Sequence, residues 1–368
     1  MTTIFCVRPQ GFNVGNDVIF LGMQSFLYEA FGKVVNIISL PATSRYESQL
    51  RSGLTAKTVH DINQYGHGVI LGGGNLYENG ELDLDLEALE ALEAPLMLFS
   101  LSRGRIYNRQ HRLVDRTNAM PASAVIALNR KARYSLTRDE ATQTYLRSLE
   151  IKKSEMGGCP SLFINRLVNR LPKLSPGDRT DVLISVRHPA LMNIPLRQQA
   201  QVTHDLVEII EFLRGEGFAD IRLLCHDQRD IPFAASFTGV EYVYTGDIYS
   251  YLALLRSCSL NVTYRLHAAL PCLSFGTPTI KISYDERAIS LMETIGLGTW
   301  NLNMMDSEAV VAQVRERYRR LDILEQLRNQ AQPIWNQLNT VMRNAFCQFA
   351  ADVLAYQDGE CCIEPTTK

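Results

Sequence analysis

The sequence predicts an α/β protein made of two doubly wound domains, and three observations support this fold class. First, the chain has 368 residues, which is longer than a typical single domain and corresponds to about two domains of common size. Second, short apolar runs rich in β-branched residues alternate with longer helical patterns, as in repeated strand-helix-strand units. Third, the polar segment 170–181 contains two prolines and a glycine, which is typical of a connection between domains.

We therefore expect a first domain at residues 1–170 and a second at residues 171–368. The strands expected in the first domain span residues 3–7, 34–40, 68–71, 96–101 and 124–128. Those expected in the second span residues 181–186, 221–225, 240–244, 260–264 and 279–283, separated by helical patterns at 199–214, 248–257 and 285–295. A final helical region, roughly 307–355, is long enough to cross back over the first domain. Ligands of such sheets bind at the carboxyl ends of the strands, so two facing sheets predict a cleft between them.

The composition excludes several classes of function. The formal net charge is only −2 and 21% of the residues are charged, so we expect no broad attraction to nucleic acid. No apolar run reaches the roughly 20 residues of a membrane-spanning helix. We therefore expect no transmembrane segment, although peripheral contact with a membrane stays open. The N-terminus shows no charged leader followed by an apolar signal core, which predicts a cytoplasmic location.

We expect no metal site. The eight cysteines form no Cys-x-x-Cys pair, and no histidine is spaced to complete a zinc site. The adjacent Cys361 and Cys362 lie in a polar tail, and we assign them no function. The segment Asp83-Leu84-Asp85 has the pattern of an acidic metal motif, but more acidic residues follow on a helical stretch, which favours a solvated helix face.

Two glycine-containing turns follow expected strands of the first domain. Backbone amides at such a turn, or at the helix start after it, can bind an anion or a sugar hydroxyl. The alternative interpretation of the first turn is an ordinary helix cap formed by asparagine. The residues that we single out as ligand contacts are Asn13, Gly15, Asn16, Gly72, Gly73, Gly74 and Asn75.

The second domain offers polar residues after two of its expected strands. Arg187 follows the strand at 181–186, where a cation would face the cleft; the alternative interpretation of Arg187 is a surface salt bridge. His226 and Asp227 follow the strand at 221–225 and could accept or donate a proton. In the alternative interpretation, Asp227 is a helix cap beside a solvated histidine.

The most informative segment of the chain is residues 261–270. Its apolar strand pattern changes to a helical pattern at Arg265 and His267, where the positive field of a helix N-terminus would help to bind a phosphate or carboxylate. Pro271 lies inside the expected helix and should kink it, because proline lacks a backbone N–H. A charged loop with Tyr284 and Asp285 follows the next strand.

The order of these motifs resembles that of the polysaccharide pyruvyl transferase family. That family has Asn-x-Gly near the N-terminus, three glycines after an early strand, an arginine after the linker strand, and Arg-x-His followed by Gly-x-Pro and Tyr-Asp. In this chain the matching residues are Asn13 with Gly15, Gly72 to Gly74, Arg187, Arg265 with His267, Gly276 with Pro278, and Tyr284 with Asp285. The match extends to about Gly298. The chain departs from the family at Asn16, where aspartate is usual, and at Arg287, where lysine is usual.

The resemblance implies two facing Rossmann-like domains in the arrangement of type B glycosyltransferases. It also implies transfer of a pyruvyl group from phosphoenolpyruvate to sugar hydroxyls as a ketal, with no cofactor. The first domain would bind the saccharide acceptor, which could be lipid-linked, and the second would bind the donor. Arg187 and Arg265 would then hold the donor's anionic groups, His267 would act as general acid, and His226 or Asp227 would accept a proton.

Two alternatives remain at this point. A glycosyltransferase that uses a nucleotide sugar would share the architecture and would also bind a diphosphate at a helix N-terminus. A non-catalytic sugar-binding subunit would tolerate the loss of Arg265 and His267, and both are present.

Overall fold

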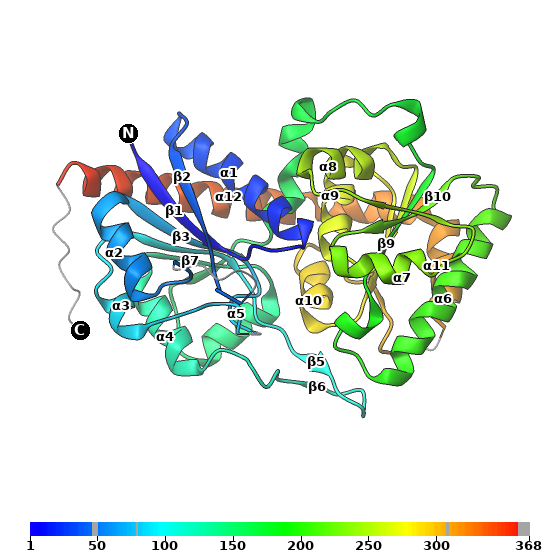
Figure 1. Ribbon diagram of the computed structural model, residues 1–368, viewed down its shortest axis with the longest axis horizontal. Helices are drawn as coiled ribbons and strands as arrows, with labels where there is room; N and C mark the ends of the chain where they lie inside the picture. Colours follow the sequence, from blue (N-terminus) through cyan, green and yellow to red (C-terminus); the bar gives the residue numbers. More distant parts are fainter. Residues whose placement is uncertain (46–50, 79, 307–308, 360–368) are drawn as a thin grey trace.

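The protein consists of two α/β halves that lie side by side, each built on a parallel sheet (Figure 1). The structure is a computed structural model and describes residues 1–45, 51–78, 80–306 and 309–359. Cys361 and Cys362 lie outside the described residues. The strands of the first sheet end at Met156, and those of the second begin at Val182. The division at residue 170 stays a prediction within the segment between these two strands.

The first sheet has the strand order β2-β1-β3-β4-β7-β8 in the described part of the chain, and all its neighbouring strands are parallel. Its strands are β1 (Thr3–Arg8), β2 (Asn36–Pro41), β3 (Gly68–Gly74), β4 (Leu96–Leu101), β7 (Tyr134–Thr137) and β8 (Ser154–Met156). Its helices are α1 (Val14–Phe31), α2 (Ala56–Tyr65), α3 (Leu86–Glu90), α4 (Ala122–Lys131) and α5 (Glu140–Ser148). A small antiparallel pair, β5 (Ile106–Tyr107) and β6 (Leu113–Val114), extends from this half.

The expectation of a strand at residues 124–128 is wrong. These residues lie in helix α4, and the strand β7 comes after it. The run Ala-Val-Ile-Ala-Leu is apolar and contains β-branched residues, so over five residues its pattern fits a strand as well as a buried helix. In the helix, Val125 and Leu128 are buried, whereas Ile126 is exposed, which is the spacing of one helix face.

The second sheet repeats this plan with the order β11-β10-β9-β12-β13-β14, again among the described residues. Its strands are β9 (Val182–Val186), β10 (Ile221–Cys225), β11 (Glu241–Tyr244), β12 (Leu260–Thr263), β13 (Thr279–Ser283) and β14 (Leu302–Asn303). Its helices are α6 (Leu196–Gly215), α7 (Ile231–Ala235), α8 (Ile248–Ser257), α9 (Leu266–Phe275), α10 (Glu286–Thr294) and α11 (Val310–Arg319). A 3-10 segment, Pro160–Arg170, leads from the first half toward the second.

Two helices connect the halves. The long helix α12 (Leu321–Gln357) contacts the second half through Trp335. The indole Nε1 of Trp335 donates a 2.8 Å hydrogen bond to the Ile295 carbonyl. Further along, Phe346 and Phe349 join the core of the first half, so the helix runs behind both sheets (Figure 1). Helix α1 belongs to the first half but also contacts the second, because Val14 and Val18 at its start pack into a core cluster of the second half. No helix in the described ranges is long and apolar enough to cross a membrane.

Candidate active site between the two sheets

A cavity of about 600 Å³ lies between the carboxyl ends of the two sheets. Both halves line it, as the fold of two facing sheets predicts. Of the residues singled out from the sequence, the cavity brings together Asn13, Asn16, Gly74, Asn75, Arg187, His226, Arg265, His267, Tyr284 and Asp285. The cavity lining does not include Gly15, Gly72, Gly73 or Asp227.

Arg265 is held in place at the start of helix α9 by contacts to both halves. Its backbone N–H donates to Thr263 Oγ1 at 2.8 Å, and its guanidinium Nη2 donates to Asn13 Oδ1 at 3.0 Å. Its Nη1 also lies 3.8 Å from a carboxylate oxygen of the buried Asp230. The guanidinium is therefore oriented before any ligand binds.

Arg187 reaches the same cavity from the end of β9. Its Nη1 lies 3.2 Å from Asp227 and 3.6 Å from Asp230. Asp230 is thus shared between Arg187 and Arg265. Arg265 lies close enough to disfavour the charge of Arg187: burial, and then Arg265, lower the pKa of Arg187. An anionic ligand would relieve this repulsion.

His267 sits at a kink in α9, and Pro271 explains the kink. The backbone angles of His267 leave the helical region (φ −85°, ψ 16°). Pro271, four residues later, has no N–H to donate to the His267 carbonyl. That carbonyl instead accepts a hydrogen bond of 3.0 Å from the buried Tyr251 hydroxyl. The sequence-based expectation of a kink is confirmed, and its effect is to fix the backbone of a cavity residue.

The imidazole of His267 has an unused ring atom. Its Nε2 is buried and has no hydrogen-bond partner within the described residues. Burial, followed by the charges of Arg138, Arg265 and Arg287, lowers the pKa of His267 well below its usual value. The shift favours the neutral imidazole at neutral pH. A bound anion would oppose the arginines and raise this pKa.

The two candidate proton acceptors are held by structural contacts. Both ring nitrogens of the buried His226 lie within 3.2 Å of the Tyr251 hydroxyl. Asp227 caps a short 3-10 helix through the Arg229 N–H and pairs with the guanidinium of Arg229. Burial would raise the pKa of Asp227, but hydrogen bonds from Arg229 and the charge of Arg187 lower it to about 2. These contacts favour a positioning role for Asp227, and proton transfer by either residue stays a prediction.

Two of the glycines singled out from the sequence leave room for neighbouring side chains, and a third lines the cavity. A Cβ at Gly15 would lie 3.0 Å from Nδ1 of His267, so the missing side chain leaves room for the imidazole. A Cβ at Gly73 would lie 2.3 Å from Cγ2 of Ile19 on α1. Gly74 has φ 104°, in the region that favours glycine, and among this run of three it alone lines the cavity. The Asn13 side chain caps α1 by accepting from the Gly15 N–H, so the capping interpretation also holds.

Several cavity residues were missed in the sequence. Arg138 directly follows β7 (Tyr134–Thr137), whereas the sequence pattern predicts the strand at 124–128, so the pattern does not place Arg138 at a strand end. Arg116 follows the small β5-β6 pair, which carries no motif. Arg287, noted only as a departure from the family pattern, donates to Glu78 Oε1 at 2.9 Å and pairs with Asp285. Burial opposes the charge of Arg287, but Asp285 and Glu78 together raise its pKa.

Other acidic residues have structural partners. Asp285 caps α10 through the Ala288 N–H at 3.0 Å. Asp83 accepts hydrogen bonds from Ser52 Oγ at 2.6 Å and from the Ser44 N–H at 2.8 Å. Asp85 caps α3. In the described ranges, no group of three or more histidine, cysteine or acidic side chains could hold a metal ion.

The fold and the cavity define the class of the protein: two Rossmann-like domains face each other as in type B glycosyltransferases, with an arginine-lined cavity between them. The sequence profile of the family described as polysaccharide pyruvyl transferase matches residues 13–286. The chain therefore belongs to the polysaccharide pyruvyl transferase family. The amylovoran biosynthesis protein AmsJ of Erwinia amylovora is 39% identical over 44 residues, which cover 12% of this chain and 11% of that protein.

Solved structures resemble the fold at low sequence identity. The UDP-GlcNAc 2-epimerase of Methanocaldococcus jannaschii, bound to UDP-GlcNAc and UDP, has a TM-score of 0.54 at 12% identity over 85% of this chain and 91% of that one. S. aureus MnaA with UDP has a TM-score of 0.55 at 12% identity and covers 100% of both chains. The Neisseria meningitidis UDP-GlcNAc 2-epimerase has a TM-score of 0.55 at 9% identity, over 90% and 93% of the two chains. These likenesses establish the fold alone.

Proposed function

We propose that this protein transfers a pyruvyl group from phosphoenolpyruvate to hydroxyls of a saccharide and forms a ketal. The observation that carries the proposal is the placement of His267, with an unused Nε2, beside arginines of both domains in one cavity. Family membership supports the reaction class. The proposal needs no metal, and it includes a cytoplasmic location.

The donor's charges suit the arginines. Phosphoenolpyruvate carries a phosphate and a carboxylate, and guanidinium groups bind both by paired, charge-assisted hydrogen bonds. Arg265 and Arg187 are already oriented by Asn13, Asp227 and Asp230. Binding therefore orders few additional side chains, which lowers its entropic cost.

The reaction requires one proton to be delivered to carbon. A sugar hydroxyl attacks C2 of the enol phosphate while C3, the methylene carbon, takes a proton from His267 and becomes a methyl group. The hydroxyl's own proton passes to a base or to solvent. The C2–O bond to phosphate then breaks, phosphate leaves with the bonding electrons, and a second sugar hydroxyl attacks C2 and loses its proton. Two new C–O bonds complete the ketal, and inorganic phosphate is the second product.

Donor binding would itself produce the acid. Burial, followed by the charges of the neighbouring arginines, favours the neutral form of His267, whereas a bound donor would add negative charge close to the ring. The imidazolium then becomes favourable only when the donor is present. This coupling would limit the acid to the loaded enzyme.

The direct test is to incubate the protein with phosphoenolpyruvate and a panel of glycosides and to measure the release of phosphate and the formation of a pyruvylated product. Release that depends on a glycoside supports the transfer. Absence of both products across a panel that includes lipid-linked saccharides would contradict it.

A nucleotide-sugar glycosyltransferase is the second candidate, because the structural neighbours are described as complexes with UDP. A ligand that binds only the folded state raises the melting temperature. We expect phosphoenolpyruvate to raise it and uridine or guanosine sugars to leave it unchanged. Stabilisation by a nucleotide sugar alone would favour this second candidate, and sugar binding without turnover would favour a non-catalytic subunit.

A further inference from the structure

Phe12 is an aromatic residue of the cavity to which the mechanism above gives no role. It lies on the loop between β1 and α1 and is 47% exposed. It joins none of the hydrophobic core clusters of the described residues. Of the large apolar side chains that are exposed in the described ranges, Phe12 is the one that lines the cavity. A small anionic donor does not account for an apolar ring at this position.

The loop that carries Phe12 is held on both sides of this residue. Before it, Gln10 Nε2 donates to Ser39 Oγ at 2.9 Å. After it, Asn13 Oδ1 accepts from the guanidinium of Arg265 at 3.0 Å. Phe12 is therefore attached to a fixed stretch of backbone, directly beside the residue that bonds to Arg265. A ligand that covers the ring has little of the loop left to order, which lowers the entropic cost of binding.

Uncharged polar side chains of the first half lie with Phe12 where the cavity opens to solvent. These residues are exposed or half-buried, and together with Phe12 we call them the cavity rim: Gln10, Asn75, Thr117 and Asn118. By contrast, the cationic residues Arg116, Arg138 and Arg265 are buried. The cavity thus has a cationic interior and an uncharged rim.

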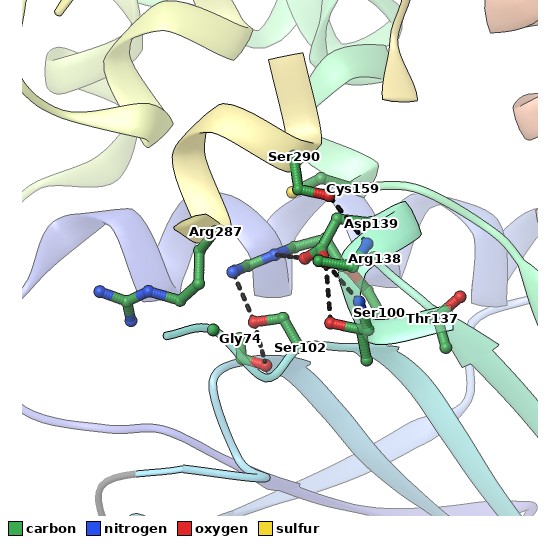
Figure 2. A network of polar contacts seen from close by, with 12 residues as sticks. Gly74, Ser100, Ser102, Thr137, Arg138, Asp139, Cys159, Arg287 and Ser290 are labelled. Carbon is green, nitrogen blue, oxygen red and sulfur yellow. Dashed lines mark hydrogen bonds and ion pairs between the residues drawn. The ribbon is translucent and has the colours of Figure 1, made fainter. Parts of the chain in front are cut away.

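Asn75 is presented by a fixed backbone. The Gly74 carbonyl before it accepts from the Ser102 N–H at 2.8 Å and from the Ser102 hydroxyl at 3.4 Å. Arg138 in turn donates to Ser102 Oγ at 2.5 Å (Figure 2). The carbonyl of Asn75 itself accepts from the Glu78 N–H at 3.1 Å. These bonds hold the main chain on both sides of the Asn75 amide.

The amides of the rim are free for a ligand. No hydrogen bond joins the side chain of Asn75 or Asn118 to another described residue. A carboxamide donates and accepts at the same time, so it can bond to two neighbouring sugar hydroxyls. The charged residues on this side, Arg45 and Glu81, lie 3.8 Å apart and offset each other's charge. The rim therefore offers hydrogen bonds without a net attraction for anions.

An exposed aromatic ring beside free amides suits a sugar. One face of a pyranose can carry only C–H bonds, which are apolar and slightly positive, whereas the face of an aromatic ring is negative. Stacking the two removes apolar surface of both from water. The hydroxyls at the edge of the sugar then point to the polar groups around the ring.

We propose that Phe12, Asn75 and Asn118 form an acceptor subsite at the cavity rim, where the Phe12 ring packs against the C–H face of an uncharged pyranose and the two amides bond to its hydroxyls. This inference rests on the proposed function, because it places the acceptor beside the donor. Phe12 adjoins Asn13, which bonds to Arg265, so a sugar stacked on Phe12 lies next to the arginine that holds the donor. Phe12 selects the acceptor and takes no part in donor binding.

The first test measures acceptor and donor separately on the full chain. The probes are the methyl glycosides of galactose, glucose and N-acetylmannosamine, and phosphate release reports turnover. Phe12→Ala should raise the acceptor KM roughly tenfold and leave the donor KM nearly unchanged. Phe12→Trp keeps an aromatic face and should retain the affinity, whereas Phe12→Leu keeps apolar volume without a ring and should not. Asn118→Ala should raise the acceptor KM several-fold.

The matched control is Tyr65→Ala. Tyr65 is an exposed aromatic residue at the end of α2, outside the cavity lining, so this variant should keep the wild-type KM for both substrates. Because Phe12 lies outside the core clusters, its variants should keep the wild-type melting temperature.

A second test needs no turnover. In saturation-transfer NMR without donor, irradiation of the aromatic protons of the protein should reach the C–H protons of a bound glycoside. The transfer should be strong in the wild type and in Tyr65→Ala, and weak in Phe12→Leu. Uridine, offered as a competing probe with an aromatic base, should receive no transfer that depends on Phe12.

Four outcomes would overturn the subsite. They are a wild-type acceptor KM in Phe12→Ala, an equal rise of its donor KM, Phe12-dependent transfer to uridine in place of the sugar, and the absence of transfer to every glycoside in the wild type. A different result separates the subsite from the proposed function. If a glycoside binds through Phe12 but phosphoenolpyruvate releases no phosphate, the sugar subsite holds and the proposed transfer fails.

Discussion

The guanidinium Nη2 of Arg265 donates a 3.0 Å hydrogen bond to the Asn13 side chain, although the two residues are 252 positions apart in the sequence. The same Asn13 oxygen accepts from the Gly15 N–H at the start of α1. Asn13 therefore joins the helix start of the first domain to the principal arginine of the second. One amide oxygen serves both as a helix cap and as an anchor for a donor-binding residue.

This relationship predicts the effects of two substitutions. Arg265→Ala should weaken donor binding by roughly 2–4 kcal/mol, because the donor anion loses a partner in a partly dry cavity. Asn13→Ala should weaken it by roughly 1 kcal/mol, since the arginine stays but loses its orientation. The double variant should resemble Arg265→Ala alone, because an anchor without its arginine has no further effect. Additive losses in calorimetry would show that Asn13 contacts the donor independently.

Much of the site could be predicted because its residues follow strands in order. Arg187, Arg265 and Tyr284 each come directly after a strand or shortly beyond it, and parallel strands place such residues at one edge. The arginines of the first domain could not be found this way. The apolar pattern predicts a strand at residues 124–128, but the strand begins at Tyr134, so the pattern does not place Arg138 at a strand end. Short apolar runs do not distinguish a strand from a buried helix.

The functions of the glycines also depend on contacts that a sequence does not show. Gly73 leaves room for Ile19, and Gly15 leaves room for His267, more than 250 residues away. Spacing alone identifies a turn, but only the packed structure shows which side chain occupies the space. The division of roles between His226 and Asp227 likewise depends on Tyr251 and Arg229, which lie beside them only in the fold.

His267→Gln tests the general acid. Glutamine keeps a similar size and a hydrogen-bond donor, so donor affinity should change little while turnover falls by roughly 10²–10⁴-fold. The wild-type rate should fall as pH rises through the pKa of donor-bound His267, because the imidazolium delivers the proton. The variant should lack this limb of the profile. Near-normal turnover in the variant would remove His267 from the mechanism.

Asp227→Asn separates a proton acceptor from a structural anchor. The variant keeps the cap on the Arg229 N–H but loses the ionic contacts to Arg187 and Arg229, so it should unfold more easily by roughly 3 kcal/mol at neutral pH. The pKa of about 2 in the folded protein lies below the ordinary aspartate value of 3.8, so this contribution is present above pH 4 and is lost as pH falls toward 2. Denaturant titrations of both proteins should therefore converge in acid. A stability difference that persists at pH 2 would contradict this account.

Gly15→Ala tests whether the space beside His267 matters. The added methyl group would lie 3.0 Å from Nδ1 of the imidazole, so the ring must shift by a few tenths of an ångström. We expect turnover to fall about tenfold or more, since small displacements of a catalytic group are costly. The matched control is Gly215→Ala at the end of α6, where a Cβ meets nothing within 4 Å. Equal activity of the two variants would show that the ring tolerates the contact.

The kink at His267 can be tested by combining substitutions at Pro271 and Tyr251. Tyr251→Phe removes the hydroxyl that donates to the His267 carbonyl, so this variant should lose roughly 1–3 kcal/mol of stability because a buried carbonyl is left unpaired. Pro271→Ala restores an N–H that can donate to the same carbonyl within the helix. The double variant should therefore be more stable than Tyr251→Phe alone, and denaturant titration of all four proteins measures this coupling.

Pro271→Ala should lower turnover, although it restores stability in the Tyr251→Phe background. In Pro271→Ala the regular helical hydrogen bond competes with Tyr251 for the His267 carbonyl, draws residue 267 toward helical angles and moves the imidazole from its cavity position. Turnover should then fall about tenfold or more in the single and the double variant, while donor affinity, which depends on the arginines, changes little. A double variant that recovered both stability and turnover would show that the kink has no role in placing the acid.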